Sequence, residues 1–323
     1  MSRKRRVAVL KGGRSLERSV SLRSAAQVQE ALQRLGHDVV GIDAGEQLVA
    51  ELLAHAPDAV FIAMHGPEGE DGTLQGILEA LGLPYTGSRP AACMRATNKL
   101  LAKLLMLEAG IPTPAFHSLR ERSIKEWGAG AALERIHQDL GVPLVVKPAR
   151  GGSALGVKFA RSEDELPGAL VGAFSYDQTV LLERYVRGRD LAVSVLGSEA
   201  GAASGANARA LPIVEAVPRE EEFYDYESRY EIGMTTFVCP AALPTRIGER
   251  AQQLALETYE LLGCHGVARI DLLLEQDSER LWVLEANVVP GMTQTSLLPQ
   301  AADAAGIAFD ELAETILASA FSR

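Results

Sequence analysis

The sequence predicts a mixed α/β protein of three units, with a parallel sheet in the first. Residues 6–92 alternate short apolar runs with helical patterns, which is typical of parallel strands joined by crossover helices. Further along, a glycine-rich loop and a carboxylate-bearing strand pair replace this alternation. At 323 residues the chain is long enough for two or three packed cores. We expect units at residues 1–95, 96–187 and 188–323.

Composition and charge narrow the class of protein. The chain is 47% hydrophobic and 23% charged, which is ordinary for a globular protein. Its net charge of −10 argues against a general nucleic-acid binder. The apolar run after the basic start, residues 7–10, is too short for a signal peptide, and none approaches a membrane span. Cys93, Cys239 and Cys264 show no metal spacing and cannot all form disulfides, which suits a reducing cytoplasm. We therefore expect a cytoplasmic protein that does not associate with a membrane.

The first unit is expected to contain three strands, at 6–10, 38–42 and 58–63, a short fourth at 84–86, and helices at 17–35, 47–54 and 74–81. The Gly12-Gly13 turn either binds an anion at a helix N-terminus or is simply a tight turn. Glu17 suits the helix dipole and would equally suit an amine-bearing substrate. His65 follows the third strand, at the sheet edge where open α/β sheets bind ligands, although a lone histidine is most often structural.

The second unit is expected to hold helices at 99–109 and 162–174 and strands at 142–147, 157–160 and 179–185. Ser162 with Glu165 three residues later predicts a capping box at the second helix. Between two of the strands, Lys147 begins a glycine-rich run that ends at Gly156. Such a loop can turn its N–H groups toward phosphate, and an ordinary glycine-rich hairpin is an equal alternative. The run matches neither the P-loop nor the G-x-G-x-x-G pattern.

The third unit is expected to start with a strand at 191–196 and an excursion of small residues to 209. Next we expect a strand at 211–216, an aromatic-rich loop at 217–235 and a helix at 247–262. A hairpin with strands at 269–274 and 281–287 comes next, and helices at about 296–305 and 309–320 close the chain.

The hairpin carries the clearest site. Side chains alternate along a strand, so Glu285 and Asn287 share a face, and a turn centred near Ser278 places Asp271 opposite Glu285. Two carboxylates held that close are unfavourable unless a cation lies between them. Oxygen ligands of this kind suit Mg²⁺. The alternative is a solvated hairpin face.

The motifs, taken in order, resemble the ATP-grasp superfamily and, within it, the D-alanine–D-alanine ligase family. The resemblance runs from about Val7 to Ile316. Its motifs are Gly12-Gly13-x-Ser15-x-Glu17, His65-Gly66-x-x-Gly69-Glu70-Asp71-Gly72, Pro84-Tyr85-Thr86-Gly87, Lys147-Pro148 with Gly152-Ser153, Phe223-Tyr224-Asp225-Tyr226 with Tyr230, Arg269-Ile270-Asp271, Glu285-Ala286-Asn287 and Pro290-Gly291-Met292-Thr293 with Ser296-Leu297.

The resemblance implies an enzyme that joins two D-alanine molecules at the expense of ATP, for peptidoglycan precursor synthesis. In such ligases the γ-phosphate passes to the first D-alanine, and the amine of the second attacks the acyl phosphate. A homodimer is also implied. Another amino-acid ligase of the same fold is the first alternative, and a non-catalytic nucleotide-binding homologue is the second.

The resemblance also implies a nucleotide and metal site. Asp271, Glu285 and Asn287 would hold two Mg²⁺ ions, with Mn²⁺ as a possible substitute. Seven further residues would contact the nucleotide. These are Lys99, Lys147, Gly152 and Ser153 at the phosphates, Glu183 and Val186 at adenine, and Asp190 at the ribose.

The amino-acid site implied by the resemblance lies beside it. Glu17 would hold the first ammonium group, with His65 nearby, while Ser296 and Leu297 would receive the second carboxylate. Two further roles are implied: Arg269 and the Gly291 N–H as oxyanion donors, and Tyr230 as the lid residue that joins Glu17 and Ser153. The chain departs from the family pattern at Asn98, Ala149, Gly151, Ala154 and Asp190, so substrate choice is less closely defined than reaction type.

Overall fold

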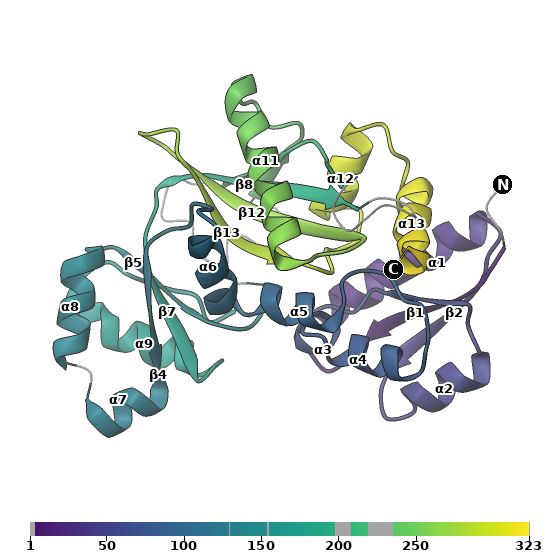
Figure 1. The fold of residues 1–323 in the computed structure, drawn as a ribbon, viewed down its shortest axis with the longest axis horizontal. Coiled ribbons are helices and arrows are strands. Elements are labelled where there is room, and N and C mark those ends of the chain that lie inside the picture. Colours follow the sequence, from purple (N-terminus) through teal and green to yellow (C-terminus); the bar gives the residue numbers. More distant parts are fainter. Residues whose placement is uncertain (1–3, 129, 154, 198–207, 219–234, 323) are drawn as a thin grey trace.

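A computed structural model describes residues 4–128, 130–153, 155–197, 208–218 and 235–322. These residues form three sheets (Figure 1). The first sheet and the helices of residues 121–174 lie toward opposite ends of the long axis, and the third sheet lies between them. The mixed α/β class is therefore confirmed.

The first sheet is parallel, as predicted. Its order is β2-β1-β3, with β1 at Arg6–Gly12, β2 at Asp38–Ala44 and β3 at Ala59–Ile62. The helices are α1 (Arg18–Arg34), α2 (Leu48–His55), α3 (Pro67–Glu70) and α4 (Thr73–Ala80). The strand expected at 84–86 is only a single bridge between Val60 and Tyr85. Pro84 has no N–H to donate, and Gly87, at φ +85°, turns the chain away.

The second sheet is antiparallel, in the order β4-β7-β5-β6. Helices α5 (Pro90–Thr97) and α6 (Lys99–Glu108) lead into it. Its strands are β4 (Phe116–Arg120), β5 (Leu144–Pro148), β6 (Lys158–Ala160) and β7 (Thr179–Arg184). Three more helices belong to this region: α7 (Glu121–Trp127), α8 (Gly130–Leu140) and α9 (Leu166–Phe174). The sequence analysis did not predict α5, β4, α7 or α8.

The predicted capping box at Ser162 is wrong. A 3₁₀ turn, Glu163–Glu165, comes first, and α9 starts only at Leu166 with a proline in its first turn. The Ser162 side chain makes no capping hydrogen bond. The Glu165 carboxylate accepts instead from the Arg161 N–H at 2.8 Å. Pro167 favours the first helical turn, where its missing N–H costs nothing, and this overrides the capping signal.

The third sheet has the strand path β11-β10-β8-β12-β13, and β9 pairs with β8. Its strands are β8 (Gly188–Leu196), β9 (Arg209–Ala210), β10 (Val214–Pro218), β11 (Thr235–Val238), β12 (Val267–Glu275) and β13 (Leu281–Asn287). The helices here are α11 (Thr245–Leu262), α12 (Leu297–Ala304) and α13 (Phe309–Ala318). The strand expected at 211–216 begins later, at Val214, and β11 was not predicted.

The first and third sheets share their hydrophobic packing. Leu10 of β1 and Val193 of β8 belong to one buried cluster, and Val28 of α1 and Leu312 of α13 belong to another. Arg34 also pairs with Asp310 at 2.6 Å, which ties α1 to α13. The second sheet has a separate cluster, which includes Leu144 and Leu170. The molecule therefore has one composite body and one independently packed sheet.

The cysteines and the helix lengths bear on two of the sequence expectations. All three cysteines are free thiols. In the part of the chain that the structure describes, no helix is both long and apolar enough to cross a membrane.

Candidate active site

The hairpin of β12 and β13 pairs Asp271 with Glu285 as predicted, although a β-bulge between Asp271 and Leu272 shifts the register nearer the turn. Asp271 lies opposite Glu285, and Arg269 lies opposite Asn287. These four side chains are partly exposed, whereas the alternate residues Ile270, Leu272 and Ala286 are buried. The pleat therefore directs all four polar groups to one face of the sheet.

Each carboxylate on this face has a cationic partner. The Arg269 guanidinium donates two hydrogen bonds to Asp271, at 2.7 and 2.8 Å. Lys99 Nζ lies 3.2 Å from Glu285 Oε2. Burial alone would raise the pKa of the Glu285 carboxyl, but the charges of Lys99 and Lys147 outweigh it and hold that pKa well below its usual range. Glu285 is thus held as an anion beside cations, and Asp271 is paired with Arg269.

Lys99 connects the hairpin to the glycine-rich loop. It is the first residue of α6, and its backbone N–H donates to the Ala149 carbonyl at 2.8 Å. Its side-chain nitrogen donates to the Gly151 carbonyl at 2.6 Å. The loop and Glu285, predicted from distant parts of the sequence, therefore meet at one buried ammonium group.

Lys147 and Glu183 form a second buried ion pair. Lys147 Nζ lies 3.0 Å from Glu183 Oε1, across neighbouring strands β5 and β7. Lys103 of α6 approaches the other oxygen at 2.6 Å and also donates to Thr113 Oγ1. Desolvation lowers the pKa of Lys103 to about 8, although Glu183 opposes that shift. Two cations thus surround one carboxylate at the predicted adenine segment.

Glu17 meets the glycine-rich loop at its other side. Ser153 Oγ donates to Glu17 Oε1, although the two residues are 136 positions apart. A Cβ on Gly152 would lie 3.2 Å from Glu17 Oε2, so this glycine also borders the carboxylate. Burial, followed by the charge of Glu70, raises the pKa of Glu17. The anion is therefore in an environment that a substrate ammonium group would stabilise.

His65 belongs to a buried polar group close to Glu17. Its Nδ1 is 3.6 Å from Glu70 Oε1, and its Nε2 is 3.2 Å from Ser24 Oγ. Its carbonyl accepts from Ser15 Oγ at 2.8 Å. Because the histidine is only 5% exposed, these contacts fix the orientation of its ring.

The other predicted site residues lie at the ends of strands, on β8 and at the start of one helix. Val186 is buried after β7, and Asp190 is a partly buried residue of β8. Gly291 follows β13, and a Cβ there would approach Ser296 Oγ to 2.6 Å. Ser296 precedes α12 and accepts from the Thr293 N–H at 3.1 Å, and Leu297 is the first residue of that helix. Tyr230 and its aromatic loop lie outside the described residues.

Models of two protein families match the chain. The D-ala D-ala ligase C-terminus model matches residues 105–318, and the D-ala D-ala ligase N-terminus model matches residues 44–88. The chain belongs to the D-alanine–D-alanine ligase family. The resemblance found in the sequence motifs is thereby confirmed.

Members of this family match over nearly the whole chain. The D-alanine–D-alanine ligase of Bordetella petrii is 44% identical, covering 98% of this chain and 92% of that protein. The Moorella thermoacetica ligase is 42% identical, covering 97% of this chain and 98% of that one.

Solved structures of similar proteins support the ATP-grasp fold class. The Bacillus anthracis D-alanine–D-alanine ligase complexed with ATP superimposes with a TM-score of 0.80 at 31% identity, covering 98% of this chain and 97% of that chain. VanG D-Ala:D-Ser ligase from Enterococcus faecalis gives 0.82 at 26% identity, covering 98% of this chain and all (100%) of that chain.

Sequence reasoning missed three polar residues of this ligase-family site. Lys103 was not singled out, although it lies four residues after Lys99 and so on the same face of α6. Ser24 was not singled out either, because a serine within an amphipathic helix carries no signal of its own. Glu70 appeared only within a motif, without a role, and the structure places it beside His65.

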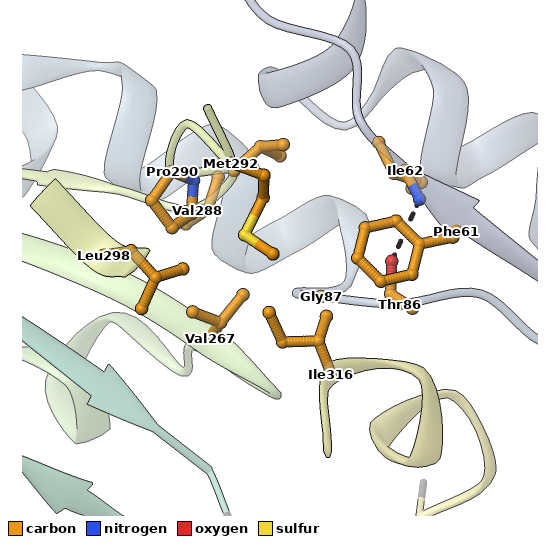
Figure 2. Close-up of a pocket in the computed structure, with 11 residues that line it drawn as sticks. Phe61, Ile62, Thr86, Gly87, Val267, Val288, Pro290, Met292, Leu298 and Ile316 are labelled. Atoms are coloured by element: carbon orange, nitrogen blue, oxygen red, sulfur yellow. Dashed lines mark hydrogen bonds between the residues drawn. The ribbon is translucent and has the colours of Figure 1, made fainter. Parts of the chain in front are cut away.

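A small apolar cavity lies under the loop that carries Gly291 (Figure 2). Its volume is about 20 Å³, roughly enough for a single water-sized probe. Phe61, Leu298 and Ile316 are among its lining residues, and the Met292 side chain reaches into it. Because the predicted site residues do not line it, the cavity anchors the loop and is not the nucleotide site.

Proposed function

We propose that the protein joins two D-alanine molecules into D-alanyl-D-alanine with cleavage of ATP to ADP and phosphate. The observation that carries this proposal is the contact between Glu17 and Ser153. It sets a residue suited to an amino-acid ammonium group directly against the loop suited to ATP phosphates. A carboxylate bound through its own ammonium group at Glu17 is thereby brought near a phosphoryl donor, and such positioning is a large part of phosphoryl-transfer catalysis.

The first step uses the cationic side of the site. Lys99 and Lys147 hold the phosphates, and the backbone of Gly152 and Ser153 covers them. A carboxylate oxygen of the first D-alanine bonds to the γ-phosphorus while the bond from that phosphorus to ADP breaks. Both reactants are anions, so fixed positive charge lowers the barrier. Glu183, Val186 and Asp190 hold the adenosine part.

The second step uses the loop after β13. Ser296 and the Leu297 N–H hold the carboxylate of the second D-alanine. Its amine attacks the acyl carbon, the bond to the phosphate oxygen breaks, and the nitrogen loses a proton. Arg269 and the Gly291 N–H stabilise the oxyanion of the tetrahedral intermediate. Tyr230 of the lid belongs to the same proposal.

The hairpin residues fit a divalent cation. Asp271, Glu285 and Asn287 offer only oxygen atoms from one sheet face, and Glu285 is held as an anion. In the described ranges no three His, Cys, Asp or Glu side chains gather as a metal cluster, and the third ligand we propose is the amide oxygen of Asn287. These residues would hold two Mg²⁺ ions, or Mn²⁺, which would neutralise phosphate charge.

The second substrate is the less constrained half of the proposal. A D-Ala:D-Ser ligase has the same fold, with a TM-score of 0.82. D-serine is therefore the alternative second amino acid. A role in peptidoglycan precursor synthesis, a cytoplasmic location and a homodimer follow from the proposed reaction and from the family.

The substrate test is phosphate release from ATP over a panel of D- and L-amino acids, with the product mass measured. When D-alanine is the only amino acid added, we expect phosphate release and a product with the mass of D-alanyl-D-alanine. D-serine or D-lactate added beside D-alanine reports the choice of second substrate. Absence of release with D-alanine would refute the proposed function.

The metal assignment is tested with Asp271→Asn. Loss of one ligand charge is expected to lower kcat/KM by roughly a hundredfold or more and to raise the Mg²⁺ concentration needed for half-maximal rate. Asp277→Asn is the matched control, because Asp277 is an exposed carboxylate on the turn of the same hairpin. Unchanged Mg²⁺ dependence in Asp271→Asn would remove Asp271 from the metal site.

A further inference from the structure

We propose that Ser24 is a positioning residue that links His65 at the amino-acid site to the loop carrying Gly291. Ser24 lies on α1, is fully buried, and touches two segments that are distant in sequence. Its Oγ accepts from the Met292 N–H at 3.1 Å and lies 3.2 Å from His65 Nε2. The proposal rests on the proposed function for the roles of His65 and Gly291, but its hydrogen-bond pattern does not.

The direction of the hydrogen bonds follows from the number of protons available. A serine hydroxyl has one proton to donate, and the Met292 N–H can only donate. Ser24 Oγ therefore accepts from Met292. Its own buried proton needs an acceptor, and among the described residues His65 Nε2 is the one within reach, so we assign the proton to that contact. Within the described residues these are the partners of Ser24. His65 Nε2 is then an acceptor, so the neutral ring carries its proton on Nδ1.

The Nδ1 proton points toward a carboxylate. Glu70 Oε1 is 3.6 Å from His65 Nδ1, and both groups are buried. The chain of polar groups therefore runs from Met292 through Ser24 and His65 to Glu70. It ends beside Glu17, whose pKa is raised by burial and then by the charge of Glu70.

At the other end, Ser24 fixes the loop that would hold the oxyanion. The Met292 side chain lines the apolar cavity of Figure 2, and its N–H is held by Ser24. Thr293 is fixed in turn by Ser296 Oγ at 3.1 Å. Gly291 precedes this doubly anchored segment, so the orientation of its peptide depends on the anchor. A single hydroxyl thus sets both the histidine tautomer and the loop.

The direct test is nitrogen NMR of the histidine rings in the full-length protein, with His65→Gln used to assign the His65 signals. We expect the neutral ring to carry its proton on Nδ1, and in Ser24→Ala the Nε2 signal should move toward the protonated position. A wild-type ring protonated on Nε2, or signals unchanged by Ser24→Ala, would overturn the proposal. This readout does not depend on ligase activity, so it remains valid if D-alanine proves not to be the substrate.

The kinetic test is a double-mutant cycle of Ser24→Ala and His65→Gln. We expect Ser24→Ala to lower kcat about tenfold, with less effect on the KM for ATP. Because the two residues act through one hydrogen bond, the double variant should lose clearly less than the product of the single losses. Fully multiplicative losses would overturn the link.

Ser319→Ala is the matched control for loss of a buried hydroxyl. Ser319 is 3% exposed and donates to the Ile316 carbonyl at 2.6 Å, away from the site. We expect its kcat and its His65 signals to match those of the wild type. If Ser24→Ala fails to fold, the wild-type tautomer still decides the proposal.

Discussion

At the scale of single residues, Glu17 has the most consequential environment. Its pKa is raised mainly by burial and then by Glu70, while the hydrogen bond from Ser153 lowers it. The folded protein therefore binds a proton here at pH values where the unfolded chain has released it. Stability then falls as pH rises from the ordinary glutamate pKa of 4.5 through the raised pKa of Glu17, and this cost is relieved when an ammonium group binds.

This environment predicts the acid limb of the pH profile for kcat/KM with D-alanine. Because Glu17 must be an anion to hold an ammonium group, the limb should lie above the ordinary carboxyl range. Glu70→Gln should move the limb to lower pH, and Ser153→Ala should move it to higher pH. Glu68→Gln on the same short helix α3 should leave it in place. Shifts of the same sign in Glu70→Gln and Ser153→Ala would contradict the assignment.

At the scale of elements, side chains from α6, β5 and β7 meet so that two cations lie against one buried carboxylate. Lys103 is fully buried, and its partner Glu183 is 3% exposed. Burial alone would raise the pKa of Glu183, but Lys147 and Lys103 lower it. The three side chains depend on one another, because any one left alone in the interior would be costly.

We therefore predict that Lys103→Met destabilises the protein by about 1–3 kcal/mol in denaturant unfolding, since Glu183 keeps Lys147 as a partner. The KM for ATP should also rise, because Glu183 would be drawn toward Lys147 and away from adenine. Lys125→Met, an exposed lysine on α7, should change stability by less than about 0.5 kcal/mol. If the two variants are equally stable, the contact of Lys103 with Glu183 does not contribute to the stability of the fold.

At the scale of the whole molecule, the separate packing of the second sheet has a measurable consequence. Leu170 of α9 belongs only to the second-sheet cluster, whereas Val193 of β8 packs with residues of the first sheet. Damage to one core should therefore stay in the sheets that the core joins.

Leu170→Ala should cost about 2–4 kcal/mol locally and increase hydrogen exchange in β5, β7 and α9. Val193→Ala should increase exchange in β8 and β12 and also in β1 and β3. Hydrogen exchange read by mass spectrometry separates the two outcomes. Faster exchange in β1 of Leu170→Ala would mean that the three sheets unfold as one unit.

The sequence by itself determined features that depend on neighbouring residues. The register of Asp271 with Glu285 followed from strand alternation and turn length, and it is correct. The parallel first sheet followed from the alternation of strand and helix patterns. The predicted start of α9 was wrong although it depended only on neighbouring residues. Two local signals, a capping serine and a proline, competed there, and only one could set the helix start.

Only the tertiary structure decided which distant groups meet. The contact of Glu17 with Ser153 spans 136 positions, and the contact of Ser24 with Met292 spans 268. Periodicity shows which face of an element is buried, but not which other element covers it. That choice depends on how whole cores pack together, and it placed Lys103 against Glu183 and one serine hydroxyl between a histidine and a loop.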